Sequence, residues 1–157
     1  MLKIYVDADG CPVKDEVYRV ARRYGLHVYV VSNRPIRVPF EAGIEAVVVG
    51  DRFDAADDWI AERIEEDDAA VTSDIPLADR CLRKGARVLG PKGQEFDERT
   101  IGQALASRAL MDQLRQMGIA GGGPAPLQQQ DRSRFLSRLD EIVQSVRRSR
   151  ASESPTS

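Results

Sequence analysis

The sequence predicts an α/β protein with a mostly parallel five-stranded sheet, followed by C-terminal helices. Short apolar segments alternate with amphipathic segments of about ten residues between positions 2 and 89, as in βαβ units. The apolar segments are nearly continuous, as expected for strands covered by helices on both faces. After Pro91 the alternation stops and two long helical patterns follow. These three observations define the fold class.

Each expected strand is short, apolar and rich in valine, isoleucine or alanine. The five segments are residues 2–6, 26–31, 45–49, 69–72 and 86–89. The first four are followed directly by polar or turn-forming residues, at Asp7, Ser32, Gly50 and Ser73. Because parallel strands share a direction, the carboxyl ends of these strands should lie along one edge of the sheet.

Apolar residues at helical spacing predict a helix between successive strands, except where a loop joins the second strand to the third. The helical segments are residues 13–24, 56–64 and 77–82. Pro12 suits a first helical turn, and Gly25 and Gly85 suit helix ends. Pro35 and Pro39 exclude regular structure in the loop at residues 34–40.

The C-terminal part divides into four segments. Residues 97–117 should form a long helix with a broad apolar face that closes the α/β domain, giving a domain of residues 1–117. A Gly/Pro-rich linker is expected at 118–130, an amphipathic helix at 131–148 and a disordered tail at 149–157. The apolar stripe of the 131–148 helix must pack on the body or on another subunit, which leaves a homo-oligomer open.

Composition excludes several classes of protein. The two cysteines and single histidine cannot form a Cys/His metal cluster, and they fit a reducing compartment. No apolar run is long enough to span a bilayer, and no signal-peptide pattern opens the chain. We therefore expect a cytoplasmic protein without membrane contact. The net charge of −2 gives no overall indication of nucleic-acid binding.

Aspartates gather at the strand ends. Asp7 and Asp9 follow the first strand, Asp74 follows the fourth, and Asp54 and Asp57 begin the helix after the third. Carboxylates brought to one edge repel one another unless a cation is present. Because hard cations prefer oxygen ligands, the pattern predicts Mg²⁺ or Mn²⁺ as cofactor, held by Asp7, Asp9 and Asp74. Asp54 and Asp57 would complete the catalytic group.

Some of these acids have a simpler alternative role. Asp54 and Asp74 each precede a helix, where aspartate is a favoured N-cap. A cap can also face a ligand, so the two roles are compatible. Asp7 and Asp9 end an apolar strand and are poor candidates for an ordinary solvated surface, which favours a functional role.

Candidate substrate-binding residues lie near the same edge. Asn33, Arg34 and Arg37 follow the second strand, and Lys14 lies in the first turn of the first helix. They would position phosphates beside the acidic centre, or they are simply solvated. Three further arginines of the C-terminal helix form either a strip facing RNA or the outer face of an amphipathic helix: Arg132, Arg134 and Arg138.

Five sequence blocks together resemble the YaiI/YqxD family of bacterial proteins. The blocks are IYVDADGCPVK, SNRPIRVP, FDAADDWI, VTSDIPLADRCLRKGARVL and GGGPAPLQQQDRSRF. The family is similar to PIN-like nucleases, which implies a three-layer PIN-like domain that cleaves single-stranded RNA with Mg²⁺ or Mn²⁺. Under this resemblance Asp7 and Asp74 match the first and last PIN acids, and Asp54 or Asp57 matches the middle one more loosely. Asp9 belongs to the YaiI/YqxD pattern alone.

Three functional hypotheses follow. The first is a metal-dependent phosphodiesterase, specifically a ribonuclease. The second is a phosphatase of the haloacid-dehalogenase type, since VDADG and GDRFD resemble two of its blocks, although VTSD follows GDRFD instead of preceding it. The third is a non-catalytic module that binds RNA or a protein partner, which the low net basicity favours.

Overall fold

The computed structural model describes residues 1–119 and 126–153, the latter without the side chain of residue 153. Its strands form one sheet in the order β3-β2-β1-β4-β5-β6. In chain order they are β1 (Lys3–Asp7), β2 (His27–Ser32), β3 (Ile44–Val48), β4 (Ala69–Val71), β5 (Arg87–Leu89) and β6 (Glu95–Phe96). The first five strands pair in parallel, and β6 pairs antiparallel to β5.

The centre of the sheet is β1, which pairs with β2 on one side and β4 on the other. From β1 the chain builds outward through β2 and β3, then returns to add β4 against the free side of β1. This reversal of direction makes the gap between the carboxyl ends of β1 and β4 a topological switch point. Open α/β sheets bind ligands at such a point.

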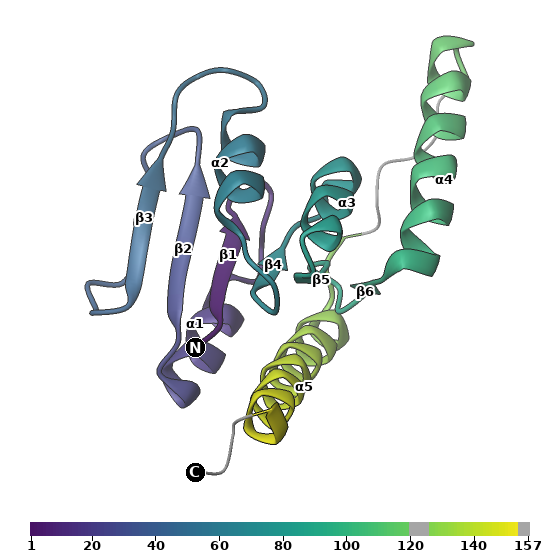
Figure 1. The fold of residues 1–157 in the computed structure, drawn as a ribbon. Coiled ribbons are helices and arrows are strands. Elements are labelled where there is room, and N and C mark those ends of the chain that lie inside the picture. Colours follow the sequence, from purple (N-terminus) through teal and green to yellow (C-terminus); the bar gives the residue numbers. More distant parts are fainter. Residues whose placement is uncertain (120–125, 154–157) are drawn as a thin grey trace.

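Helices cover both faces of the sheet, giving three layers (Figure 1). The helices are α1 (Lys14–Tyr24), α2 (Ala55–Arg63), α3 (Ile75–Arg83), α4 (Glu98–Gln116) and α5 (Gln129–Glu153). Side chains alternate along β1, so that Ile4 and Val6 face α1 and α5, whereas Tyr5 faces α2 and α3. The expected three-layer, mostly parallel α/β architecture is confirmed.

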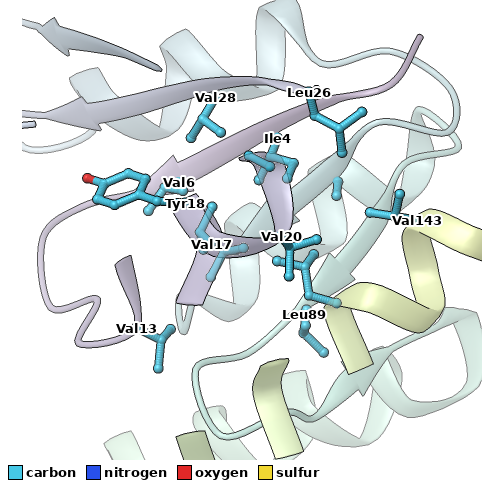
Figure 2. Packing of buried hydrophobic residues seen from close by; sticks show 14 of the residues in the cluster. Ile4, Val6, Val13, Val17, Tyr18, Val20, Leu26, Val28, Leu89 and Val143 are labelled. Carbon is cyan, nitrogen blue, oxygen red and sulfur yellow. The ribbon is translucent and has the colours of Figure 1, made fainter. Parts of the chain in front are cut away.

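The C-terminal helix packs on its own chain. Phe135, Leu139, Ile142, Val143 and Val146 are buried and join the core formed by β1 and α1. Figure 2 shows Val143 of α5 beside Leu89 and Val20 in this layer. The apolar stripe that left a homo-oligomer open is thus covered within the chain. The oligomeric state itself stays a prediction.

Several element boundaries differ from the expectation. The sheet has six strands because the two-residue β6 adds an antiparallel edge, too short to give a sequence pattern. Helix α5 begins at Gln129, inside the expected linker, and continues to Glu153, so residues 149–153 are helical rather than a disordered tail. The rest of the expected linker core, 120–125, and of the tail, 154–157, lie outside the described residues.

Helix α4 closes the domain less fully than its apolar residues suggest. Its N-cap is Asp97, whose side chain accepts hydrogen bonds from the amides of Arg99 and Thr100. Of its side chains only Ile101 is buried, and Leu110 and Met111 are exposed. Beyond its first turns the helix projects away from the body (Figure 1). The expected broad apolar face is therefore only partly covered, with Ala104 and Leu105 half-buried against the core beside Ile101.

If α5 is part of the core, Phe135→Ala should lower the free energy of unfolding by about 3–5 kcal/mol, because it leaves a cavity in a fully buried site. The matched control is Leu110→Ala on α4, where the side chain is 56% exposed and the change should be within about 0.5 kcal/mol. Urea denaturation monitored by circular dichroism measures both. Equal small effects would contradict the packing of α5.

Candidate functional site

The Thr72 hydroxyl joins the two acids at the switch point. It donates a hydrogen bond to Asp7 Oδ2 at 2.8 Å and accepts one from the backbone N–H of Asp74 at 2.9 Å. Thr72 is 2% exposed, so the hydroxyl is held in place by its surroundings. This arrangement fixes the end of β1 against the loop that follows β4.

Asp74 also caps helix α3. Its Oδ1 accepts the backbone N–H of Leu77 at 2.9 Å, and Pro76 follows in the first turn. The capping alternative weighed for Asp74 is therefore confirmed. Because the cap uses Oδ1, and no hydrogen bond to Oδ2 occurs within the described residues, one carboxylate oxygen remains for a ligand.

A second hydroxyl holds Asp9. Ser32, buried at the end of β2, donates from Oγ to Asp9 Oδ1 at 3.3 Å and accepts the Arg34 backbone N–H at 3.1 Å. The side-chain oxygen of neighbouring Asn33 is buried but has no hydrogen-bond partner among the described residues. A buried oxygen without a donor is costly, so it marks a place where a water molecule or a cation would bind favourably.

The acids at the start of α2 separate into two groups. Asp54 is at the N-cap position but makes no capping hydrogen bond, and instead it pairs with Arg52 at 2.8 Å on the surface. Asp58 pairs with Arg52 and Arg80. Asp57 has no ion pair among the described residues and faces the strand-end acids. Of the middle acids considered, the structure thus places Asp57, and not Asp54, beside Asp7 and Asp74.

These side chains line one open cavity of about 620 Å³. Its polar lining includes Asp7, Asp9, Asn33, Asp57, Asp74 and Arg108. The exposed residues Asp51 and Phe53, from the loop before α2, form part of its rim. The cavity therefore gathers residues from β1, the loop after β2, α2, α3 and α4 at the switch point, which is the sheet edge predicted from the sequence.

Burial and mutual repulsion make this cavity unfavourable for negative charge. Loss of hydration raises the pKa of Asp7 to about 6, against the opposing hydrogen bond from Thr72, and the charges of Asp74 and Asp9 add smaller increases. The pKa of Asp57 is also raised to about 6, first by burial and then by the charges of Asp74 and Asp7. A cation in the cavity would relieve the same repulsion.

The donor set fits a hard cation in its chemistry, since it consists of carboxylate oxygens and one amide oxygen. Within residues 1–119 and 126–153, however, no three His, Cys, Asp or Glu side chains are already arranged as a metal site. Mg²⁺ keeps several water ligands and is often bound through only one or two carboxylates. Two acids of the predicted set would therefore suffice, and the metal stays a prediction.

The predicted phosphate-binding cations lie elsewhere. Lys14 donates to the carbonyl of Cys11 at 2.8 Å and so secures the loop after β1. The side chains of Arg34 and Arg37 are exposed, and in the described part of the chain neither lines the cavity. Of the four substrate-binding candidates, Asn33 alone contributes to it.

Sequence reasoning missed Thr72, Ser32, Phe53, Asp51 and Arg108. The two hydroxyl residues could have been found, since each ends an apolar strand and lies within two residues of a polar candidate. Arg108 has no such signal. It lies 34 positions after Asp74 and reaches the cavity only because α4 passes beside α3.

The fold and the cavity define an open, mostly parallel α/β protein with a carboxylate-lined site at its switch point. Residues 5–145 match the family described as "Uncharacterized BCR, YaiI/YqxD family", and the chain belongs to this family. It is 59% identical to a UPF0178 protein of Rhodospirillum centenum, over 96% of this chain and all of that protein. No solved structure was found to match the chain significantly.

Two further relatives show the same coverage. A UPF0178 protein of Rhodopseudomonas palustris strain BisB18 is 54% identical, over 94% of this chain and 95% of the relative. One from Paramagnetospirillum magneticum is 54% identical, over 94% of this chain and 98% of the relative. The full extent of the fold is thus shared with these proteins. Among the described helices, none is both long and apolar enough to cross a membrane.

The raised pKa of Asp7 has a consequence for stability. Between about pH 4 and pH 6, the Asp7 carboxyl keeps its proton in the folded protein but has lost it in the unfolded chain. The free energy of unfolding should therefore fall as pH rises through this window and level off above it. Without metal, Asp7→Asn should therefore raise stability at pH 7.5 by roughly 2 kcal/mol and flatten this pH dependence.

Thermal unfolding in EDTA across this pH range checks the effect. Asp112→Asn, at an exposed ion pair on α4, is the matched control and should change little. A loss of stability in Asp7→Asn at neutral pH would contradict the unfavourable burial of the carboxylate.

Proposed function

We propose that the protein is a divalent-metal-dependent phosphodiesterase that cleaves single-stranded RNA in the switch-point cavity. The observation that carries the proposal is the convergence of Asp7, Asp57 and Asp74 with Arg108 in one open cavity. Acids that favour a bound cation, beside an arginine that can bind phosphate, suit a phosphodiester substrate. The resemblance to PIN-like nucleases agrees with this reaction class.

Each residue of the cavity has a proposed role that follows from its position. Thr72 orients Asp7, and the N-terminus of α3 orients Asp74, so both carboxylates are held before the substrate arrives. Asp57 has a pKa of about 6 and can accept a proton from an attacking water near neutral pH. The Arg108 guanidinium can hold a phosphate oxygen in two-point contact.

The proposed cofactor is Mg²⁺ or Mn²⁺, bound by Asp7 and Asp74 with Asp9 nearby. When bound, such an ion supplies positive charge that stabilises the developing charge on the phosphate and makes water a better nucleophile. The buried Asn33 side-chain oxygen, which has no hydrogen-bond partner in the described part of the chain, offers a further neutral ligand, directly or through water. A cation bound by these residues would offset the cost of placing carboxylates where burial opposes their charge.

The first test is cleavage of labelled single-stranded RNA with Mn²⁺, compared with EDTA. Asp7→Asn and Asp74→Asn should each lower kcat/KM by at least about a hundredfold, since each removes a charge that would hold the ion. Asp54→Asn and Asp112→Asn are controls of equal charge outside the cavity, and both should stay within about threefold of the wild type.

Two outcomes would contradict the proposal. One is an inactive wild type across single-stranded, duplex and structured RNA with either ion. The other is unchanged activity in Asp7→Asn. Trapping of a phosphoryl analogue on the Asp7 carboxylate would support the haloacid-dehalogenase alternative instead, because a nuclease using Asp7 as a metal ligand forms no aspartyl-phosphate.

Phe53 gives a second test of the substrate. Its ring is 96% exposed at the rim of the cavity, where an unpaired base could stack on it. Phe53→Ala should raise KM for RNA by about five- to tenfold with little change in kcat, and Phe53→Trp should preserve KM. Phe40→Ala is the control, since Phe40 is equally exposed but lies outside this cavity. Matching KM values for Phe53→Ala and Phe40→Ala would rule out stacking.

A further inference from the structure

Two more pockets continue from the acidic cavity along the surface. Ser73 and Ile75 line both the acidic cavity and an adjoining pocket of about 390 Å³. Lys92 and Gln94 in turn line both this pocket and a third one of about 590 Å³. Because each pocket shares two wall residues with the next, the three lie next to one another along the surface.

The middle pocket is mainly apolar. Pro12, Ile75, Pro91, Phe96 and Leu127 contribute to its wall, together with the backbone at Gly10 and Gly90. Its wall thus comes from the loops after β1 and β5, the start of α3, strand β6 and the segment before α5. An apolar pocket next to a site for phosphate chemistry suits a flat, uncharged group such as a nucleobase.

The third pocket is basic. Lys92, Arg134 and Arg138 line it, from the β5–β6 turn and from α5. Its two acids are engaged elsewhere, since Glu95 pairs with Arg87 and Asp97 caps α4. Arg134 pairs with Asp131 at 3.5 Å, whereas Arg138 is exposed and forms no hydrogen bond or ion pair with the part of the chain that the structure describes. The pocket therefore presents cationic groups suited to an anion.

The walls of the basic pocket are held close together. Gly93 in the β5–β6 turn has a φ of +85°, and a Cβ there would come within 2.7 Å of Arg134 Cγ. The turn and α5 are thus in direct contact, which fixes Lys92 near the two arginines. The structure also separates the three tail arginines. Arg132 bonds to the Pro12 carbonyl and Glu16, whereas Arg134 and Arg138 turn to this pocket.

We propose that these pockets form a binding track for a single strand of RNA. The scissile phosphate lies in the acidic cavity, a neighbouring base enters the apolar pocket, and a second phosphate binds Lys92, Arg134 and Arg138. The inference rests on the proposed function for the identity of the strand. The alternation of anion-binding, apolar and cationic sites matches the alternation of phosphate and base along unpaired nucleic acid. A duplex keeps its bases stacked inside and could not fill the middle pocket.

The test measures binding, so it does not depend on turnover. Fluorescence anisotropy with the full chain compares a uridine dinucleotide with an oligouridylate of about eight nucleotides, in Mg²⁺ and in EDTA. For the longer strand, Arg138→Gln should weaken binding about five- to tenfold, as expected for a lost charge-assisted bond. It should also lower the slope of log affinity against log salt by about 0.7, the contribution of one phosphate on a single strand.

Controls of length and position make the result specific. The uridine dinucleotide has a single phosphate, which the acidic cavity would hold, so Arg138→Gln should leave its binding unchanged. Arg148→Gln removes the same charge from an exposed position on the same helix, outside the pocket, and should leave both affinities unchanged. Photocrosslinking with thiouridine in the longer strand should label residues 90–96 and 127–138.

The results separate this proposal from the proposed function. Length-dependent binding through Arg138 without cleavage would support the track and count against the ribonuclease. Cleavage with equal binding by Arg138→Gln and Arg148→Gln would overturn the track and leave the ribonuclease standing. Failure of the longer strand to bind in either buffer, or crosslinks confined to residues 22–44, would also overturn the track.

Discussion

The parallel pairing of β1 with β4 is the constraint on which the rest of the structure depends. It places the chain reversal at the middle of the sheet, and it brings Asp7 and Thr72 together although they are 65 positions apart. Helices α1 and α5 pack against one face of these strands, and α2 and α3 against the other. The cavity lies where this pairing ends. The same strand pairing therefore organises both the core and the candidate site.

The pairing of β1 with β4 also places a carboxylate where its charge lowers the stability of the fold. A strand buried on both faces delivers its terminal carboxylate into a place poor in water, which raises the pKa of Asp7 to about 6. Hydroxyl groups at the ends of β2 and β4 offset part of this cost by donating to Asp9 and Asp7. Among the described residues, Asp7 Oδ1 and Asp74 Oδ2 accept no hydrogen bond, which is the arrangement expected of acids that bind a positively charged ligand.

The sheet could be predicted from sequence because its strands are continuous apolar runs separated by helical periodicity. The sheet edge at which the acids lie could also be predicted, because the carboxyl ends of parallel strands meet at one edge. Contacts set by tertiary packing could not be foreseen. Asp54 and Asp57 are equivalent in pattern, yet Arg52 draws Asp54 to the surface while Asp57 faces the cavity. The apolar residues of α4 suggested burial, but only its first turns meet the body, and that placement brings Arg108 to the site.

Helix α5 belongs both to the core and to the surface near the site, because one of its faces is apolar and buried and another carries exposed arginines. Its apolar stripe completes the layer formed by α1, and Arg132 ties its start to the Pro12 carbonyl and Glu16 beside the β1 loop. The helix is therefore fixed relative to the end of β1, which carries Asp7. Arg134 and Arg138 lie two and six residues further along the same helix, so this anchorage also sets where they lie, and Arg134 pairs in addition with Asp131. A mutation that loosened the apolar stripe would thus displace these cations relative to the acids without altering any residue of the cavity.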